Sequence, residues 1–213
     1  MIDACETISS LDSVYEELDA DNPIPILRSW FEKARNFELN DPESAALATV
    51  GSSNWPEVRM VLVKGVNVGD LVVFTNLASK KGRDIAHLDR VSLLFYWKSL
   101  RRQVKINGEV AKISKIEADA YFAKRARGKQ IAAWASKQSN VLESLEGLEE
   151  VAGKYENKFG GIEVPRPKYW SGFRVIPSVV EFWRHRGSRL HLRVEFIRQQ
   201  VVPDLWRRRL LSP

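Results

Sequence analysis

The sequence predicts a mainly β protein with inserted helices, folded as an antiparallel, Greek-key-like barrel. Two observations predict this class. Apolar and polar residues alternate over short segments throughout the chain, as they do in strands that bury one face. Short turns join most consecutive segments, which suits antiparallel hairpins better than a doubly wound parallel sheet. The 213 residues suit one domain, and we expect a flexible N-terminal tail over 1–22 and a single domain over 23–213.

The first elements follow from periodicity. Ile26, Trp30 and Ala34 are spaced four residues apart, with Leu27 and Phe31 beside them, which predicts an amphipathic helix over 25–37. Alternation bounded by turn residues predicts the strands. They are expected over 44–50, 57–66, 70–76, 91–97, 101–113, 171–177, 178–186, 189–198 and 204–210.

Helices are expected at three further places. Ser79 opens a short helix over 79–89, because a serine side chain can cap a first turn. Residues 114–139 are expected to be helical, with a break near Gly128, and a charged helix follows over about 142–159. Residues 164–170 form an extended linker.

The stretch Arg-Leu-His-Leu-Arg at 189–193 places two arginines and a histidine at every second position. In a strand, Arg189, His191 and Arg193 would share one face. The opposite face would carry Leu190, Leu192, Val194 and Phe196. By itself this pattern fits a solvated strand face as well as a face that binds an anion.

Composition narrows the class of protein. The chain is 44% hydrophobic and 28% charged, as in ordinary globular proteins. Cys5 is the only cysteine, so no internal disulfide can form and a reducing compartment fits. The acidic N-terminus has no apolar signal-peptide core, and the longest clear apolar run, 91–97, is too short to span a membrane. We therefore expect a cytoplasmic protein with no membrane partner.

The net charge of +6, with eight arginines between residues 184 and 209, is compatible with an anionic partner. Yet no helix-turn-helix, zinc-finger or RNA-reading motif is present, so no nucleic-acid partner is expected. No G-x-G-x-x-G motif follows a predicted strand, so a Rossmann-type nucleotide site is not expected. No histidine or cysteine cluster has metal-ligand spacing, so no metal is expected.

Seven blocks of the chain occur together in a recognisable order. They are RMVLVKG (59–65), FTNLASKKG (74–82), SLLFYWKSLRRQV (92–104), AYFAKRARGKQIAAWASKQS (120–139), VPRPKYWSGFRV (164–175), EFWRHRGSRLHLR (181–193) and RRLLSP (208–213). In this order they resemble the pyridoxamine 5′-phosphate oxidase family over about residues 24–213. The resemblance implies a split β-barrel that forms a homodimer and binds FMN at the subunit interface. It also implies oxidation of pyridoxamine or pyridoxine 5′-phosphate to pyridoxal 5′-phosphate, with O2 as acceptor and H2O2 as product.

The resemblance also implies roles for single residues. Arg189 and His191 match the family's catalytic pair over the substrate. The other substrate ligands that it implies are Lys64, Tyr121, Arg125 and Lys129. The residues implied for FMN are Arg59, Met60, Val61, Leu62, Lys64, Phe74, Thr75, Lys80, Lys81, Gln103, Gln138, Ser139, Trp183 and Arg193.

Physical reasoning adds to three of these assignments. Tyr121 and Arg125 are four residues apart, so on a helix they would face one point. Arg59 and Lys64 are five residues apart on one strand, so they should point to opposite faces. Lys80 and Lys81 begin a predicted helix, whose free N–H groups favour an anion.

The chain departs from the family pattern at three positions. Lys80 stands where arginine is usual, Lys129 where serine is frequent, and Leu192 where the family motif has aspartate. Two other flavin proteins stay open as alternatives: a related oxidase of the phenazine-pathway type, and a non-catalytic FMN-binding protein. The residues Lys64, Tyr121 and Arg125 favour a phosphorylated substrate over the first alternative.

Overall fold

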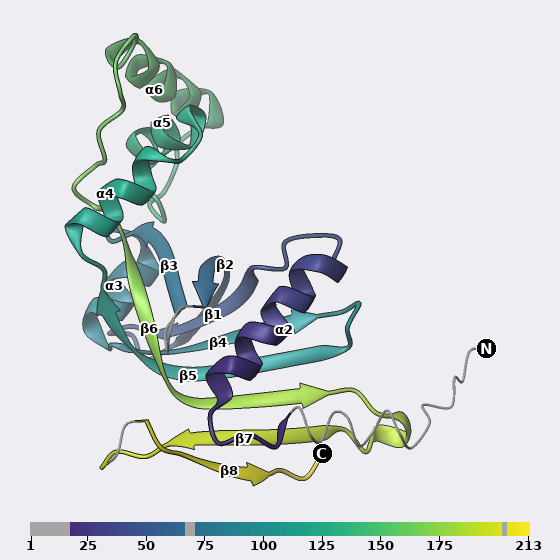
Figure 1. The fold of residues 1–213 in the computed structure, drawn as a ribbon. Helices are drawn as coiled ribbons and strands as arrows, with labels where there is room; N and C mark the ends of the chain where they lie inside the picture. The colour runs from purple at the N-terminus through teal and green to yellow at the C-terminus, as the bar shows by residue number, and fades with distance from the viewer. Residues whose placement is uncertain (1–17, 67–70, 202–203) are drawn as a thin grey trace.

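The computed structural model describes residues 18–66, 71–201 and 204–213. Figure 1 shows a curved sheet with one helix lying across it and a column of three helices projecting from one end. The described residues form eight strands in one sheet, in the order β3-β2-β1-β4-β5-β6-β7-β8. The strands are β1 (Ser44–Val50), β2 (Pro56–Val66), β3 (Leu71–Asn76), β4 (Arg90–Trp97), β5 (Arg102–Lys112), β6 (Trp170–Arg184), β7 (Leu192–Arg198) and β8 (Trp206–Leu210).

A second pairing of β3, with β6, closes the sheet into a barrel. Strands β1 to β6 form this barrel, and β7 and β8 extend the sheet from β6. Two barrel contacts, β1 with β4 and β3 with β6, join strands that are not consecutive in the chain, as in a Greek key. The predicted class is therefore confirmed, although the two strands expected over 171–177 and 178–186 form one long strand, β6, which ends at Arg184.

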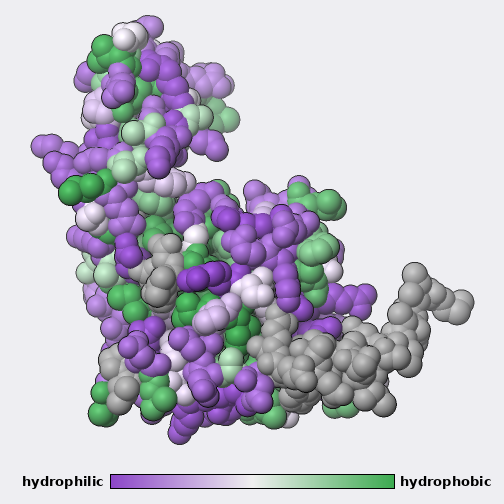
Figure 2. All heavy atoms as spheres, viewed as in Figure 1, coloured by the Kyte–Doolittle hydropathy of each residue, from purple (hydrophilic) through white to green (hydrophobic). Residues whose placement is uncertain are grey.

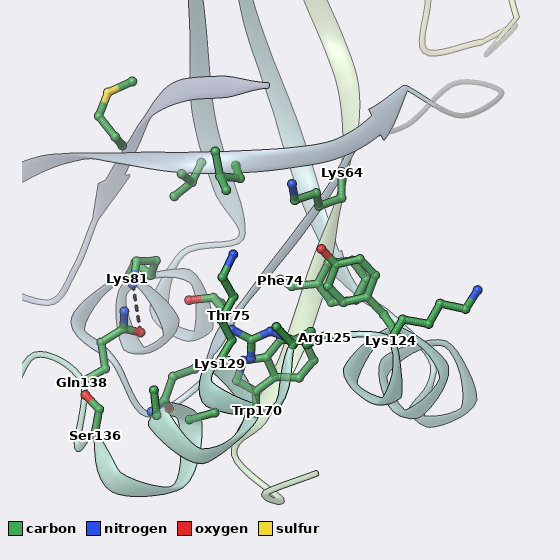
Figure 3. Close-up of a pocket in the computed structure, with 18 residues that line it drawn as sticks. Lys64, Phe74, Thr75, Lys81, Lys124, Arg125, Lys129, Ser136, Gln138 and Trp170 are labelled. Atoms are coloured by element: carbon green, nitrogen blue, oxygen red, sulfur yellow. Dashed lines mark hydrogen bonds between the residues drawn. The ribbon is translucent and has the colours of Figure 1, made fainter. Parts of the chain in front are cut away.

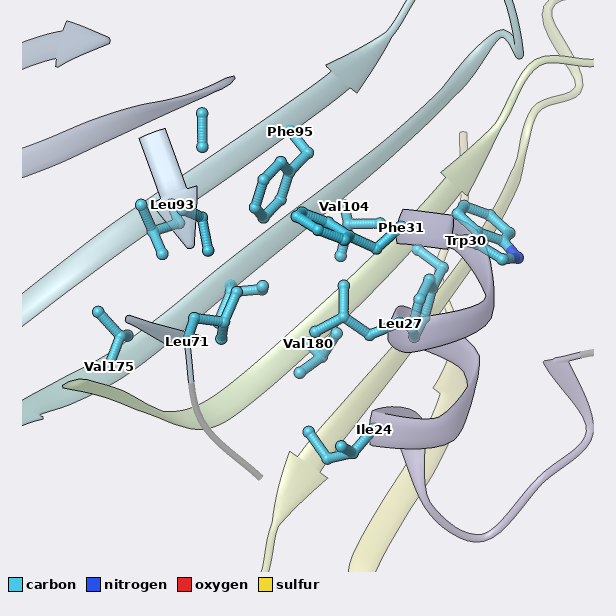
Figure 4. Close-up of a cluster of buried hydrophobic side chains, with 14 of the residues drawn as sticks. Ile24, Leu27, Trp30, Phe31, Leu71, Leu93, Phe95, Val104, Val175 and Val180 are labelled. Atoms are coloured by element: carbon cyan, nitrogen blue, oxygen red, sulfur yellow. The ribbon is translucent and has the colours of Figure 1, made fainter. Parts of the chain in front are cut away.

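The predicted amphipathic helix is α2 (Pro23–Phe37), and its apolar stripe faces the barrel core (Figure 4). The Asn22 side chain caps it by accepting a hydrogen bond from the N–H of Ile24 at 2.9 Å. Trp30 packs edge-on against Phe182 of β6, with ring centroids 5.0 Å apart. The helix residues buried in this core are Ile24, Ile26, Leu27, Trp30, Phe31 and Ala34.

Helix α3 (Lys80–His87) starts where the sequence predicts, because the Ser79 hydroxyl accepts a hydrogen bond from the N–H of Gly82. The other helices, α4 (Lys115–Ala123), α5 (Arg127–Ala135) and α6 (Leu145–Lys158), are all inserted between β5 and β6. They form the projecting column of Figure 1, and Figure 2 shows hydrophilic residues over most of its visible face. No helix among the described residues is long and apolar enough to cross a membrane.

The break in the 114–139 segment lies earlier than the expected position near Gly128. Helix α4 ends at Ala123 and α5 begins at Arg127. The reason is a side-chain cap: the buried Gln130 amide donates to the carbonyl of Phe122 at 2.9 Å, which ends α4. Arg125 therefore lies in the connecting turn, and the expectation that Tyr121 and Arg125 share a helix face is wrong.

The expected strand at 189–198 also starts later, at Leu192. Gly187–Arg189 form a turn in which Ser188 and Arg189 have positive φ angles of 55° and 59°. This turn reverses the chain between β6 and β7, so Arg189 and His191 are not in a strand and do not share a strand face with Arg193. Leu190, expected to be buried, is 64% exposed, whereas the predicted core positions Leu192, Val194 and Phe196 are buried.

Most of the predicted tail, residues 1–17, lies outside the described residues. At its end Leu18 is fully buried in the core cluster, and Asp19 forms an ion pair with Arg208 of β8 at 2.5 Å.

Candidate active site

A cavity of about 620 Å³ lies between the barrel and the projecting helices (Figure 3). Strands β2 and β3, the α4–α5 turn and the residues after α5 all contribute to its wall. Eleven predicted site residues line it: Met60, Val61, Leu62, Lys64, Phe74, Thr75, Lys81, Tyr121, Arg125, Lys129 and Gln138. The barrel thus brings together segments that are separated by more than a third of the sequence.

Two cations of this cavity, the buried Lys81 and the half-buried Arg125, have no carboxylate partner among the residues that the structure describes. Lys81 is 9% exposed, and its ammonium donates to Gln138 Oε1 and to the Ser79 hydroxyl, each at 3.3 Å. Burial lowers the pKa of Lys81, and the charge of Arg59 lowers it further. Burial also lowers the pKa of Arg125, and its Nη1 has no hydrogen-bond partner. A buried cation that lacks a counter-charge favours the binding of an anion.

Lys64, another cation of the lining, has a carboxylate partner. Its Nζ donates to Glu43 Oε2 at 2.5 Å, and the other oxygen of Glu43 accepts from Arg35 of α2 at 2.6 Å. Burial by itself raises the pKa of Glu43, but the hydrogen bonds and charges of Lys64 and Arg35 outweigh it and hold the pKa below its usual value. Glu43 is therefore ionised at neutral pH and neutralises part of the charge at Lys64.

Arg59 and Lys80 do not line the cavity but meet at a buried carboxylate, Asp84 of α3. Arg59 donates to the Thr49 hydroxyl at 2.6 Å, and its guanidinium lies 3.6 Å from Asp84. Lys80 reaches Asp84 at 3.4 Å, and Thr49 donates to Asp84 at 2.8 Å. Glu57 also pairs with Lys80, at 3.2 Å.

The remaining predicted residues form a second group at the far end of β6. Trp183 lies opposite Gln103 of β5 on one side and opposite Arg193 of β7 on the other. The His191 ring lies 4.8 Å from the Trp183 ring, and its Nδ1 accepts from the N–H of Arg186 at 3.2 Å. Arg193 is paired with Glu181 at 2.8 Å.

Arg189 lies in the turn just before His191, close to this second group in the chain. Ser139 directly follows the cavity residue Gln138 and has a positive φ of 71°. Within one chain, the structure therefore divides the predicted site residues between two places.

Sequence reasoning missed several residues of the cavity. Trp170 was within a family block but had no role assigned, and its burial at the start of β6 could not be inferred from spacing. No motif in the sequence pointed to Glu43 or Asp84, because each of these carboxylates acts through a cation that is distant in the chain. The other lining residues without an expected role are Asn76, Lys124, Ala126, Ala132, Ala133 and Ser136.

Comparison with known proteins agrees with this geometry. The family description "Pyridoxamine 5′-phosphate oxidase" matches residues 31–157, which is more than half of the chain. The chain belongs to the pyridoxamine 5′-phosphate oxidase family. A second family description, "Pyridoxine 5′-phosphate oxidase C-terminal dimerisation region", matches residues 170–213.

Individual relatives from this oxidase family cover 84% to 98% of the chain. The pyridoxine/pyridoxamine 5′-phosphate oxidase of Mesorhizobium japonicum is 48% identical over 180 residues, covering 84% of this chain and 88% of its own length. The protein of the same name from Brucella abortus is 44% identical over 208 residues, covering 98% and 100%.

Two solved structures share the split-barrel fold of the family. PhzG from Burkholderia lata, in complex with tetrahydrophenazine-1-carboxylic acid, superposes with a TM-score of 0.84 at 27% identity, covering 92% of this chain and 94% of its own. A pyridoxamine 5′-phosphate oxidase-related, FMN-binding protein from Nostoc punctiforme gives a TM-score of 0.72 at 14% identity, covering 92% and 100%. The second likeness concerns the fold alone.

Proposed function

We propose that this family member is an FMN-dependent oxidase that converts pyridoxamine or pyridoxine 5′-phosphate to pyridoxal 5′-phosphate, with O2 as electron acceptor and H2O2 as second product. The observation that carries the proposal is the pair of cations, the buried Lys81 and the half-buried Arg125, that line one cavity without a carboxylate partner among the described residues. Two phosphates, one from the cofactor and one from the substrate, would supply the missing counter-charges. The relatives that are named for this activity support the same function.

The donor set of the site suits FMN. Lys81, with Arg59 and Lys80 nearby around Asp84, would hold the flavin phosphate at the first turn of α3, where backbone N–H groups also favour an anion. Further contacts would come from 60–62, Phe74, Thr75, Gln138 and Ser139, and from Gln103, Trp183 and Arg193 of the second group. When bound, FMN supplies two-electron acceptor chemistry that the side chains of this chain lack.

The substrate would be anchored at its phosphate by Lys64, Tyr121 and Arg125, which line one part of the cavity. Lys129 lines the same cavity and would add a further cation. Arg189 and His191 would orient the pyridine ring and its substituent. Because His191 Nδ1 accepts a backbone hydrogen bond, a neutral His191 carries its proton on Nε2, where it can donate to the substrate.

The two groups of site residues are the reason to propose a homodimer. Strand β6 begins at Trp170 beside the cavity and ends near Trp183 at the opposite end of the molecule (Figure 1). It has 15 residues, and at about 3.3 Å per residue it spans up to roughly 50 Å. None of the second-group residues Gln103, Trp183, Arg189, His191 and Arg193 lines the cavity of the same chain, as far as the described residues show. A partner subunit that places its second group over the cavity would complete the site.

An apolar surface next to the cavity supports this dimer. Val58, Met60 and Leu62 point outward from β2 and are 65%, 64% and 45% exposed. On the neighbouring strands Ala46 lies opposite Met60 and also opposite Leu94, so the surface continues onto β4. Exposed apolar patches of this kind mark protein interfaces. We propose the cytoplasm as location, which the single cysteine supports.

The phenazine-pathway alternative draws on the likeness to PhzG. The cluster of Lys64, Tyr121, Arg125 and Lys129 in the cavity lining favours a phosphorylated substrate instead, because a phosphate has three oxygens and up to two negative charges to share among several donors, whereas a carboxylate has two oxygens and one charge. The deciding experiment incubates the purified yellow protein with pyridoxine 5′-phosphate and oxygen and follows the aldehyde product by absorbance. We expect turnover with the phosphorylated substrate and far less with pyridoxine. A flavin-loaded protein without turnover would indicate the non-catalytic alternative.

Sedimentation tests the dimer. We expect the flavin-loaded protein to sediment as a dimer, and Met60→Asp to weaken both dimerisation and flavin binding, because it places a charge on the apolar surface beside the cavity. A monomer that retains flavin would contradict the shared site.

A further inference from the structure

The guanidinium of Arg125 is held by aromatic rings rather than by acidic side chains. Its Cζ lies 4.8 Å from the ring centroid of Trp170 and 5.7 Å from that of Phe122. Figure 3 shows Arg125 lying against Trp170, whereas Lys124 extends away from it. Buried Nη1 has no hydrogen-bond partner. The position of this cation therefore depends on ring contacts.

Trp170 is itself fixed from several sides. It is 6% exposed and is the first residue of β6. Its ring stacks on Phe74 at 5.6 Å and 10°, and Phe74 in turn stacks on Tyr121 at 3.7 Å and 7°. It also meets Phe122 edge-on at 5.0 Å. The indole thus joins the barrel to α4 and cannot shift without displacing rings on both.

The backbone around Trp170 adds a second anchor. Arg166 donates from Nη1 to the carbonyl of Trp170 at 2.5 Å and pairs through Nε with Asp119 of α4 at 2.6 Å. The start of β6 is therefore tied to the same helix that precedes Arg125.

We infer that Trp170 is a positioning residue that determines specificity for a phosphorylated substrate. A carboxylate next to Arg125 would also fix the guanidinium, but it would compete with the phosphate. An aromatic face attracts the cation and leaves the in-plane N–H donors free for a phosphate. The phosphate then supplies both the hydrogen bonds and the charge that Arg125 lacks. This inference rests on the proposed function, because it assigns the anion to the substrate.

The test uses Trp170→Leu, which removes the ring, and Trp170→Phe, which keeps a smaller one. Trp97→Phe is the matched control, since Trp97 is also buried but packs against Phe31 and Phe95 in the main core, a different cluster from that of Trp170. For each variant, kcat and KM are measured with pyridoxine 5′-phosphate and with pyridoxine, and inorganic phosphate is measured as a competitive ligand by calorimetry.

We expect Trp170→Leu to raise KM for the phosphorylated substrate and Kd for inorganic phosphate by about threefold to thirtyfold, the range of an Arg–Trp cation–π contact. The values for kcat and for pyridoxine should stay within about twofold, Trp170→Phe should fall in between, and Trp97→Phe should resemble wild type. In the Arg125→Met background, replacing Trp170 should change phosphate affinity little, because the residue acts through Arg125.

Equal losses for pyridoxine and its phosphate would overturn the inference, as would additive losses in the double variant. If Trp170→Leu does not fold, the comparison of Trp170→Phe with Trp97→Phe and the Arg125→Met cycle still decide it. The calorimetric arm separates the two proposals: a wild-type protein that binds inorganic phosphate through Trp170 and Arg125 but turns over no substrate would refute the proposed function alone.

Discussion

The ion pair between Glu43 and Lys64 makes a sharp prediction about substrate affinity. Glu43 holds the Lys64 ammonium at 2.5 Å, on the wall of the cavity where a phosphate is expected. A phosphate must therefore share Lys64 with Glu43 or displace it. Glu43→Gln keeps the shape of the side chain and removes its charge. We expect the variant to bind pyridoxal 5′-phosphate more tightly than wild type.

The magnitude follows from the exposure of the pair. The side chains of Lys64 and Glu43 are 29% and 21% exposed, so solvent screens their attraction only in part. Partly exposed ion pairs contribute roughly 0.2–1 kcal/mol. Removing the competing carboxylate should therefore lower Kd by up to about fivefold. The gain should shrink as salt is added, because ions screen the charges.

The assay is a fluorescence titration of the flavin-loaded protein with pyridoxal 5′-phosphate at low and high salt. Glu32→Gln is the matched control: Glu32 also pairs with Arg35, at 3.3 Å, but does not contact Lys64. We expect this control to match wild type. Weaker binding by Glu43→Gln would refute the reasoning, because it would mean that the carboxylate orients Lys64 toward the phosphate instead of competing with it.

Three further outcomes are expected. Arg125→Ala should raise KM for the phosphorylated substrate by about tenfold to a hundredfold, the value of a charge-assisted hydrogen bond, while the flavin dissociation constant stays unchanged; colourless protein would contradict this. Leu192→Ala should lower the free energy of unfolding by about 2–5 kcal/mol in a urea titration because Leu192 is buried, whereas the control Leu190→Ala, at a 64% exposed position, should change it by less than about 0.5 kcal/mol. Burial alone raises the pKa of Glu181, but Lys105 and Arg193 lower it on balance below its usual 4.5. The stability that this ionised group contributes is therefore present above about pH 4.5 and is lost as pH falls through the lower pKa of the folded state. The unfolding free energy of Glu181→Gln should accordingly depend less on pH in that acid range, and an unchanged pH profile would count against the pairing.

Much of this protein could be predicted from local patterns. The spacing of Ile26, Trp30 and Ala34 identified the buried face of α2, and Ser79 identified the start of α3. These predictions succeed because amphipathic periodicity and capping are properties of neighbouring residues. The resemblance of the seven sequence blocks to the family predicted most of the residues that line the cavity.

Other features depended on contacts between distant residues. The amide of Gln130 ends α4 at Ala123, and the turn at 187–189 removes Arg189 from the strand that its alternating neighbours predicted. The alternation of polar and apolar residues indicates which side chains would share a face if a strand formed. It does not indicate where the chain must reverse direction.

The charge state of the site was also decided by the tertiary structure alone. In the sequence, Lys64 and Arg125 are equivalent cations of one expected phosphate site. In the fold, Lys64 meets Glu43 just before β1, and Arg125 meets the ring of Trp170 at the start of β6. Residue type determines that a side chain carries a charge, whereas only the packing of distant elements determines whether a carboxylate, a ring or a ligand lies beside it.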